Sequence, residues 1–256
     1  MKKCRIVTFA NQKGGVGKTS ASHALATGLT QKGYKVLAVD TDPQGNLSYT
    51  MGADTEAPGV YEMMKGTCAP HDAVQRTTQG DVICGSLMLS SADIDFNGVG
   101  REYLLAEALE PLASRYDFIV IDSPPQLGVL TINALTAAND VIVPMGADIY
   151  SIIGYSQLLE TIDKVRKRCN PGLIIAGLLM TRHNNRTILG RDLKDALEEK
   201  ARLLGSKIFK SFIREGVAVK EAQTNRESLY ASKSKVAEDY IAFVDEYLKG
   251  CELLAS

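Results

Sequence analysis

The sequence predicts an α/β fold of three layers, a twisted and mainly parallel sheet flanked by helices. Short apolar segments rich in Val and Ile alternate with segments of helical periodicity. Several apolar segments contain no polar alternation, as expected of strands covered on both faces. A glycine-rich stretch joins the first strand to the first helix. The length of 256 residues suits a single domain spanning residues 1–256.

The segments follow one another in strand–helix order. We expect strands at residues 4–10, 35–40, 81–86, 118–122, 140–145, 173–181 and 207–213. We expect helices at residues 18–31, 101–114, 130–138, 155–168, 187–204 and 235–249. Residues 45–78 are loop-rich and are assigned no regular element. Because ligands of open parallel sheets bind at the carboxyl ends of the strands, the residues that follow the strands are the candidates for function.

The last predicted helix has two different faces. An apolar stripe at helical spacing predicts a face packed on the core, formed by Val236, Tyr240, Phe243, Val244, Tyr247 and Leu248. The exposed face is expected to carry acids, namely Glu238, Asp239, Asp245 and Glu246. A helix that lies on a membrane surface would have Lys and Arg there, so this helix argues against membrane attachment.

The stretch Asn-Gln-Lys-Gly-Gly-Val-Gly-Lys-Thr at residues 11–19 predicts a phosphate-binding loop between a strand and a helix. A glycine-rich turn can be purely structural, but the terminal Lys-Thr argues against that alternative. Lys18 would reach the β- and γ-phosphates, and the Thr19 hydroxyl would ligate Mg²⁺. Backbone N–H groups and the helix N-terminus would surround the phosphate. The expected nucleotide-binding residues are Gly14, Gly15, Val16, Gly17, Lys18, Thr19 and Ser20.

Lys13 is an additional lysine at the start of this loop. An ordinary phosphate-binding loop needs no lysine there, so Lys13 indicates extra negative charge to neutralise. It can act on the nucleotide of its own chain or on that of a second subunit. A solvated loop lysine is the simpler alternative.

Two acids end the second predicted strand, Asp40 and Asp42, one residue apart. Acids beside a phosphate are costly unless they serve Mg²⁺ or a water. Asp42 is the candidate for positioning the attacking water, and Asp40 for supporting the Mg²⁺ shell. A turn aspartate before Pro43 is the alternative for Asp42.

The strand Phe-Ile-Val-Ile-Asp ends at Asp122 and is typical of a Walker B segment. Asp122 would hold Mg²⁺ through a water or through the Thr19 hydroxyl. Many buried strands end in Asp, so this pattern alone is weak evidence for a Walker B segment. It becomes strong evidence together with the phosphate loop and the acids at the end of strand two.

Other chemistries find no support. The five cysteines are scattered without a C-x-x-C pair, and the three histidines lack ligand spacing. No G-x-S-x-G elbow occurs, no apolar run is long enough to span a membrane, and no signal peptide is found. The scattered cysteines fit a reducing cytosol.

The charge is unevenly distributed. Residues 164–235 contain 17 Lys/Arg and 7 Asp/Glu, a net +10, although the chain has a net charge of −1. This asymmetry favours a basic face for an anionic polymer or surface, and interspersed surface charges are the alternative.

These motifs resemble those of the deviant Walker A ATPases, the ParA/MinD superfamily of P-loop NTPases, and are most similar to short Soj-like ParA partition ATPases. The matching pieces begin with Lys13-Gly-Gly-Val-Gly-Lys18-Thr19 and Asp40-Thr-Asp42-Pro-Gln-Gly-Asn46. Ile121-Asp122-Ser-Pro-Pro125 and Val141-Ile-Val-Pro144 also match, so the resemblance covers nearly the whole chain.

The resemblance implies ATP and Mg²⁺ as cofactors and an ATP-dependent homodimer in which Lys13 reaches the partner's phosphates. It implies catalytic roles for Lys13, Lys18 and Asp42, metal-binding roles for Thr19, Asp40 and Asp122, and a place near the adenine for Thr181 and Arg182. A ParB-like centromere-binding protein would stimulate hydrolysis. Residues 147–150, Ala-Asp-Ile-Tyr, match the family's acidic-aromatic signature only in part.

By the same resemblance, the ATP-bound dimer would bind nonspecific DNA through basic residues of the C-terminal part. Arg186 lies in a segment similar to the family's arginine-bearing loop. A second family arginine is replaced by Ala218, in what we expect to be a late loop, and the substitutes would be Arg214, Lys220 and Arg226.

The sequence therefore predicts a cytoplasmic, nucleoid-associated ATPase, with slow basal turnover, that partitions a chromosome, plasmid or mobile element. No helix-turn-helix precedes the first strand, so binding to a specific operator is not expected. One alternative is a MinD-like ATPase positioned on a membrane or protein matrix. Another is a slow nucleotide-switch adaptor.

Overall fold

The computed structural model describes residues 4–146, 149–182, 201 and 206–255. Its eight-stranded sheet has the order β3-β4-β2-β5-β1-β6-β7-β8. Every neighbouring pair is parallel except β3 and β4. The strands are β1 (Arg5–Phe9), β2 (Val36–Asp40), β3 (Val74–Thr77), β4 (Gly80–Ile83), β5 (Phe118–Asp122), β6 (Asp140–Gly146), β7 (Ile174–Thr181) and β8 (Ile208–Ile213).

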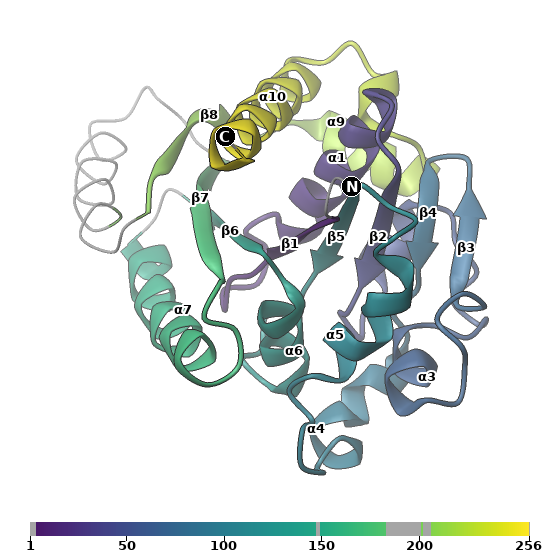
Figure 1. Cartoon of the computed structure of the whole chain (residues 1–256). Helices are drawn as coiled ribbons and strands as arrows, with labels where there is room; N and C mark the ends of the chain where they lie inside the picture. Colours follow the sequence, from purple (N-terminus) through teal and green to yellow (C-terminus); the bar gives the residue numbers. More distant parts are fainter. Residues whose placement is uncertain (1–3, 147–148, 183–200, 202–205, 256) are drawn as a thin grey trace.

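Helices cover both faces of the sheet, which confirms the predicted three layers (Figure 1). One face packs on α1 (Lys18–Gln31), α2 (Asn46–Thr50), α9 (Val217–Asn225) and α10 (Lys235–Ala255). The other face packs on α3 (Val60–Lys65), α4 (Ala92–Asp95), α5 (Leu104–Leu109), α6 (Val129–Ala137) and α7 (Ile149–Arg168). The described residues also form short 3₁₀ helices at Leu87–Ser91, Glu110–Leu112 and Leu229–Ala231.

The side-chain alternation of the strands explains this layering. In β6, Val141, Val143 and Met145 point into the core beneath α7, whereas Ile142 joins the core beneath α1 and α10. Both sets are fully buried. Because successive strand residues face opposite sides, a strand that is apolar throughout requires a helical layer on each face.

Some predicted elements differ from the observed ones. The helix expected at residues 101–114 is the short α5 followed by a 3₁₀ turn that contains Pro111, because proline has no N–H for the helical ladder. Helix α7 begins at Ile149, earlier than predicted. The loop-rich stretch 45–78 contains α2, α3 and β3. The segment expected to be a late loop contains the helix α9.

Helix α10 confirms the expected apolar stripe, since its residues from Val236 to Tyr247 at helical spacing are buried. Of the four acids expected on its outer face, Glu238 is exposed and the other three are engaged by neighbouring segments. Asp239 pairs with Arg214, Asp245 pairs with Lys32, and Glu246 accepts hydrogen bonds from the backbone of Lys210 and Ser211. The helix predicted at residues 187–204 falls, apart from residue 201, outside the described residues. Within the part of the chain that the structure describes, no helix is both long and apolar enough to span a membrane.

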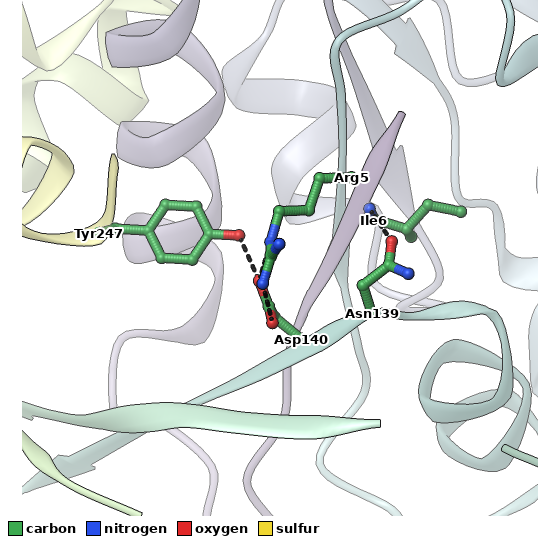
Figure 2. Close-up of polar contacts among 5 residues, drawn as sticks. All are labelled: Arg5, Ile6, Asn139, Asp140 and Tyr247. Atoms are coloured by element: carbon green, nitrogen blue, oxygen red, sulfur yellow. Dashed lines mark hydrogen bonds and ion pairs between the residues drawn. The ribbon is translucent and has the colours of Figure 1, made fainter. Parts of the chain in front are cut away.

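A buried ionic cluster closes the amino edge of the sheet (Figure 2). The Asp140 carboxylate at the start of β6 accepts two hydrogen bonds from Arg5 of β1, at 2.6 and 2.8 Å. The Tyr247 hydroxyl of α10 donates a third, at 2.8 Å. Asn139 accepts a further bond from the Ile6 backbone. The cluster fastens α10 to two central strands, at the edge away from the phosphate loop.

Gly85 follows β4 and packs directly on the end of β2. A Cβ on Gly85 would lie 2.7 Å from the carbonyl oxygens of both Asp40 and Asp42. This spacing is below any ordinary carbon–oxygen contact, and backbone atoms cannot swing away as a side chain can. Only glycine therefore fits between β4 and the end of β2.

We expect Gly85→Ala to destabilise the fold by roughly 1–3 kcal/mol, because the backbone around Asp40 must shift. Urea denaturation measures this loss. Gly98→Ala is the matched control, since a Cβ there meets nothing within 4 Å. Equal stability of the two variants would show that the backbone at the end of β2 can shift at little cost in free energy.

Candidate active site

The strand register brings three chain segments together at the carboxyl edge of the sheet. Phe9, the last residue of β1, lies opposite Asp122 of β5, and Asp40 of β2 lies opposite Asp122 on its other side. The Ser123 hydroxyl donates to the Phe9 carbonyl oxygen at 2.8 Å. The phosphate loop and both predicted acidic segments therefore meet at one place.

The phosphate loop turns on two glycines in the left-handed region. Gly15 has φ 73° and Gly17 has φ 84°, conformations that residues with a Cβ rarely adopt. Helix α1 begins directly after Gly17, with no side-chain cap and no acid in its first turn. Its first N–H groups and its positive dipole end are therefore available to an anion.

Two buried side chains connect this loop to the sheet, Asn11 from the loop and Thr181 from β7. The Asn11 amide donates to the Pro144 carbonyl oxygen at 2.7 Å and accepts from the Lys13 N–H at 3.0 Å. The Thr181 hydroxyl donates to the Val16 carbonyl oxygen at 2.8 Å. Strands β6 and β7 thus fix the shape of the loop. Thr181 was assigned from the resemblance to the adenine region, and the structure places it in the core directly behind the loop.

Lys18 extends across the loop and is 7% exposed. Its ammonium lies 3.4 Å from the Lys13 carbonyl oxygen. Burial lowers the pKa of Lys18, and the nearby Asp122 and Asp42 carboxylates oppose that shift. A partly desolvated lysine of this kind gains when an anion enters beside it.

Asp122 is completely buried and its carboxylate oxygens have no hydrogen-bond partner within the described residues. Burial, followed by repulsion from Asp40, raises the pKa of Asp122 to about 8. The Thr19 hydroxyl, which is close to the carboxyl group but outside hydrogen-bond geometry, and the Lys18 charge oppose that shift. An unsatisfied buried carboxyl group is costly in a folded protein. It is the group expected to gain most from a cation.

Asp40 is equally buried, but the protein satisfies it. One of its oxygens accepts from the N–H and the hydroxyl of Ser48, at 2.8 and 2.7 Å. The other accepts from the Asp42 N–H at 3.1 Å. Burial raises the pKa of Asp40 to about 6 against these hydrogen bonds. Asp40 therefore joins the end of β2 to α2.

Asp42 is 8% exposed and borders the cavity next to Lys18 and Thr19. One carboxylate oxygen accepts from the Gln44 N–H at 2.9 Å. The preceding Thr41 donates through both its N–H and its hydroxyl to the Asp122 carbonyl oxygen, at 2.9 and 2.7 Å. The end of β5 thus holds the backbone beside Asp42 in place.

A cavity of about 520 Å³ opens over the phosphate loop. It is lined by predicted site residues, which are Gly14, Gly15, Gly17, Lys18, Thr19, Ser20, Asp42 and Arg182. It is also lined by Asn46 and Pro125, which end two of the matched motifs but were given no role. The sequence analysis did not single out four further lining residues, which are Tyr49, Thr50, Gln223 and Thr224. These four come from α2 and α9, two short helices whose weak periodicity gave no signal.

The expected DNA-binding residues have different surroundings. Arg214 is bound by Asp239 through two side-chain hydrogen bonds of 2.7 Å. Lys220 is exposed on α9. Arg226 ends α9, and its guanidinium lies 4.2 Å from the centre of the Tyr49 ring. Arg186 falls outside the described residues.

Similarity to known proteins covers most of the chain. A family model described as an AAA domain matches residues 4–175. The sporulation initiation inhibitor protein Soj of Bacillus subtilis is 39% identical over 250 residues, which covers 94% of this chain and 97% of Soj. The chromosome partitioning protein ParA of Myxococcus xanthus is 35% identical and covers 96% of this chain and 88% of that protein.

A solved structure supports the same relationship. The cobyrinic acid a,c-diamide synthase from Mycobacterium smegmatis, with bound ATP analog and magnesium, is 34% identical with a TM-score of 0.82. The match covers 97% of this chain and 96% of that chain. The resemblance predicted from the motifs is thereby confirmed, and the chain belongs to the ParA/MinD-type family of P-loop ATPases.

Proposed function

We propose that this chain is a partition ATPase of the ParA type. It binds ATP with Mg²⁺, forms a homodimer, and binds nonspecific DNA in the ATP state. A ParB-like partner then stimulates hydrolysis and releases the DNA. The observation that carries the catalytic part is the convergence of an uncapped helix N-terminus, Lys18 and Asp42 at one cavity, with the buried Asp122 close to Lys18 beneath it.

In this proposal the phosphates bind at the N-terminus of α1. Lys18 neutralises the charge that develops on the transferred phosphoryl group, and Lys13 adds a positive charge from the partner subunit. Asp42 orients a water that attacks the γ-phosphorus. The bond to the β–γ bridging oxygen then breaks, and ADP and inorganic phosphate leave. The rigid turn that contains Asp42 supports this role.

The donor set fits Mg²⁺. Among the described residues, no group of three His, Cys, Asp or Glu side chains forms a metal cage. Mg²⁺ typically takes one or two protein ligands and completes its shell with phosphates and water. The unsatisfied carboxyl group of Asp122 and the Thr19 hydroxyl would hold it, and Asp40 would support them indirectly through its bonds to Ser48 and Asp42. The bound ion would supply charge neutralisation at the phosphates.

The DNA step rests on charge and family rather than on a contact. The net +10 segment contains cations already engaged within the protein, such as Arg214 with Asp239. The exposed Lys220 is therefore a better candidate for DNA phosphates than Arg214, and Arg186 is a candidate from the family resemblance. A membrane-bound role finds less support, because the apolar face of α10 is buried in the core and Glu238 is exposed on its outer side.

We expect Asp42→Ala and Asp42→Asn each to slow ATP hydrolysis at least about 100-fold while ATP still binds, because both lack the carboxylate that orients the water. Single-turnover hydrolysis and nucleotide titration measure the two properties. Asn still accepts from the Gln44 N–H, so it preserves the turn. Normal hydrolysis by Asp42→Asn with loss in Asp42→Ala would mean that Asp42 serves the turn and not the water.

We expect Asp122→Asn to raise the stability of the nucleotide-free protein by about 1–3 kcal/mol at pH 8 and to weaken Mg²⁺-dependent ATP binding. The folded state retains the Asp122 proton up to about pH 8, whereas the unfolded chain releases it near pH 4. The stability contribution of Asp122 therefore falls as pH rises between these values. The advantage of the variant should grow over the same range, which urea denaturation at pH 5 and pH 8 checks.

Asp140→Asn provides a control of opposite sign. Its carboxylate is satisfied by Arg5 and Tyr247, so its loss should destabilise the protein by about 3 kcal/mol. If Asp122→Asn were instead less stable than the parent protein at pH 8, the unsatisfied carboxyl group would not be the source of strain in this site.

We expect the protein to be retained on DNA with ATP but not with ADP or without nucleotide, and to be released as salt rises, because each phosphate contact expels counterions. Lys220→Glu and Arg186→Glu should weaken retention. Arg115→Glu, an equal charge change at an exposed residue outside the basic segment, should not. If the protein binds ATP but is not retained on DNA in any nucleotide state, the DNA proposal is wrong and the matrix is a membrane or a protein. Liposome sedimentation distinguishes these two.

A further inference from the structure

Gln79 lies in the turn between β3 and β4, and its side-chain amide reaches three other elements. Its oxygen lies 2.8 Å from His23 Nε2 of α1. Its nitrogen donates to the carbonyl oxygen of Thr50 in α2 at 2.7 Å and to that of Arg226 at the end of α9 at 3.0 Å. Both amide hydrogens and the amide oxygen are therefore used.

The two carbonyl groups fix the orientation of this amide, because a carbonyl oxygen accepts only and must face the amide nitrogen. The Gln79 oxygen then faces His23 Nε2 and accepts from it in the tautomer that carries a hydrogen there. His23 is 4% exposed, and burial lowers its pKa. The three hydrogen bonds thus form one consistent set.

The helices joined by this amide form one wall of the cavity above the phosphate loop. Helix α2 contributes Tyr49 and Thr50, and α9 contributes Gln223 and Thr224. Helix α2 has five residues and α9 has nine, lengths at which a helix does not persist without tertiary support. The wall therefore depends on whatever holds these helices against each other.

Two further contacts run along the same seam. The Arg226 guanidinium stacks on the Tyr49 ring, joining the end of α9 to α2. The Gln223 amide donates to the Ser20 hydroxyl at 3.3 Å, one residue after Thr19. Of the contacts described at this seam, the Gln79 amide alone touches α1, α2 and the end of α9 together.

We propose that Gln79 is a positioning residue for the nucleotide site, holding α2 against α9 so that their side chains form a preorganised wall for ATP. The inference rests on the proposed assignment of this cavity to ATP. Gln79 does not line the cavity and touches no reacting group. Its loss should weaken nucleotide binding and leave the chemical step, which depends on Lys18 and Asp42, nearly unchanged.

The test compares three variants by ATP affinity, steady-state KM and kcat, and thermal unfolding without nucleotide. Gln79→Glu keeps the acceptor for His23 but places a carboxylate against two carbonyl groups. Gln79→Met keeps the size and removes all three hydrogen bonds without adding charge. Gln75→Glu is the matched control, because the Gln75 amide makes similar bonds from the same hairpin to Asp54 and Cys84, away from the cavity.

We expect both Gln79 variants to raise KM and the Kd for ATP about tenfold, with kcat within about twofold of the parent, as loss of buried hydrogen bonds predicts. Gln75→Glu should lower the unfolding temperature without changing KM. If the foldable Gln79 variants only unfold earlier, or if Gln75→Glu raises KM equally, Gln79 is merely structural. Parent protein that binds ATP but never DNA would overturn the partition proposal and leave this inference standing.

Discussion

The burial of Asp122 beside Asp40 is the constraint on which the rest of the site depends. The parallel register of β1, β2 and β5 makes these two acids neighbours in a fully buried environment. Two carboxylates cannot both be charged there without compensation. The protein satisfies Asp40 through Ser48 and the Asp42 backbone, and leaves Asp122 to a ligand. A cation that binds beside Asp122 would therefore gain free energy at the place where the phosphates are proposed to react.

The buried aspartates at the two edges of the sheet differ in their hydrogen-bond partners. At the amino edge, Asp140 receives hydrogen bonds from Arg5 and Tyr247, and the cluster locks α10 onto the sheet. At the carboxyl edge, Asp122 has no comparable partner within the described residues. Breaking a satisfied buried ion pair is costly, whereas an unsatisfied buried carboxyl group gains when a cation enters beside it. The amino edge therefore has a satisfied ionic cluster, and the carboxyl edge has a carboxyl group that a bound cation would satisfy.

The cavity wall opposite the sheet has a different origin. Strands and α1 fix the phosphate loop, but α2 and α9 are short and are held by side-chain contacts such as those of Gln79 and Arg226. Asp40 fastens α2 to the end of β2 through Ser48, and this contact does not involve Gln79. The segment that contains Asp42 therefore keeps its own support from the sheet when the contacts of Gln79 are lost.

The sequence by itself determined the three-layer fold, the family and the place of the phosphate loop, because apolar strands covered on both faces and the Gly-Gly-Val-Gly-Lys-Thr pattern are local signals. Only the tertiary structure decided that Asp40 is satisfied and Asp122 is not, that Thr181 braces the loop from behind, and that α9 forms a cavity wall. Burial and hydrogen-bond partners arise from segments far apart in the chain. Whether a carboxylate is satisfied, or a short helix is held in place, therefore cannot be predicted from the periodicity of the sequence.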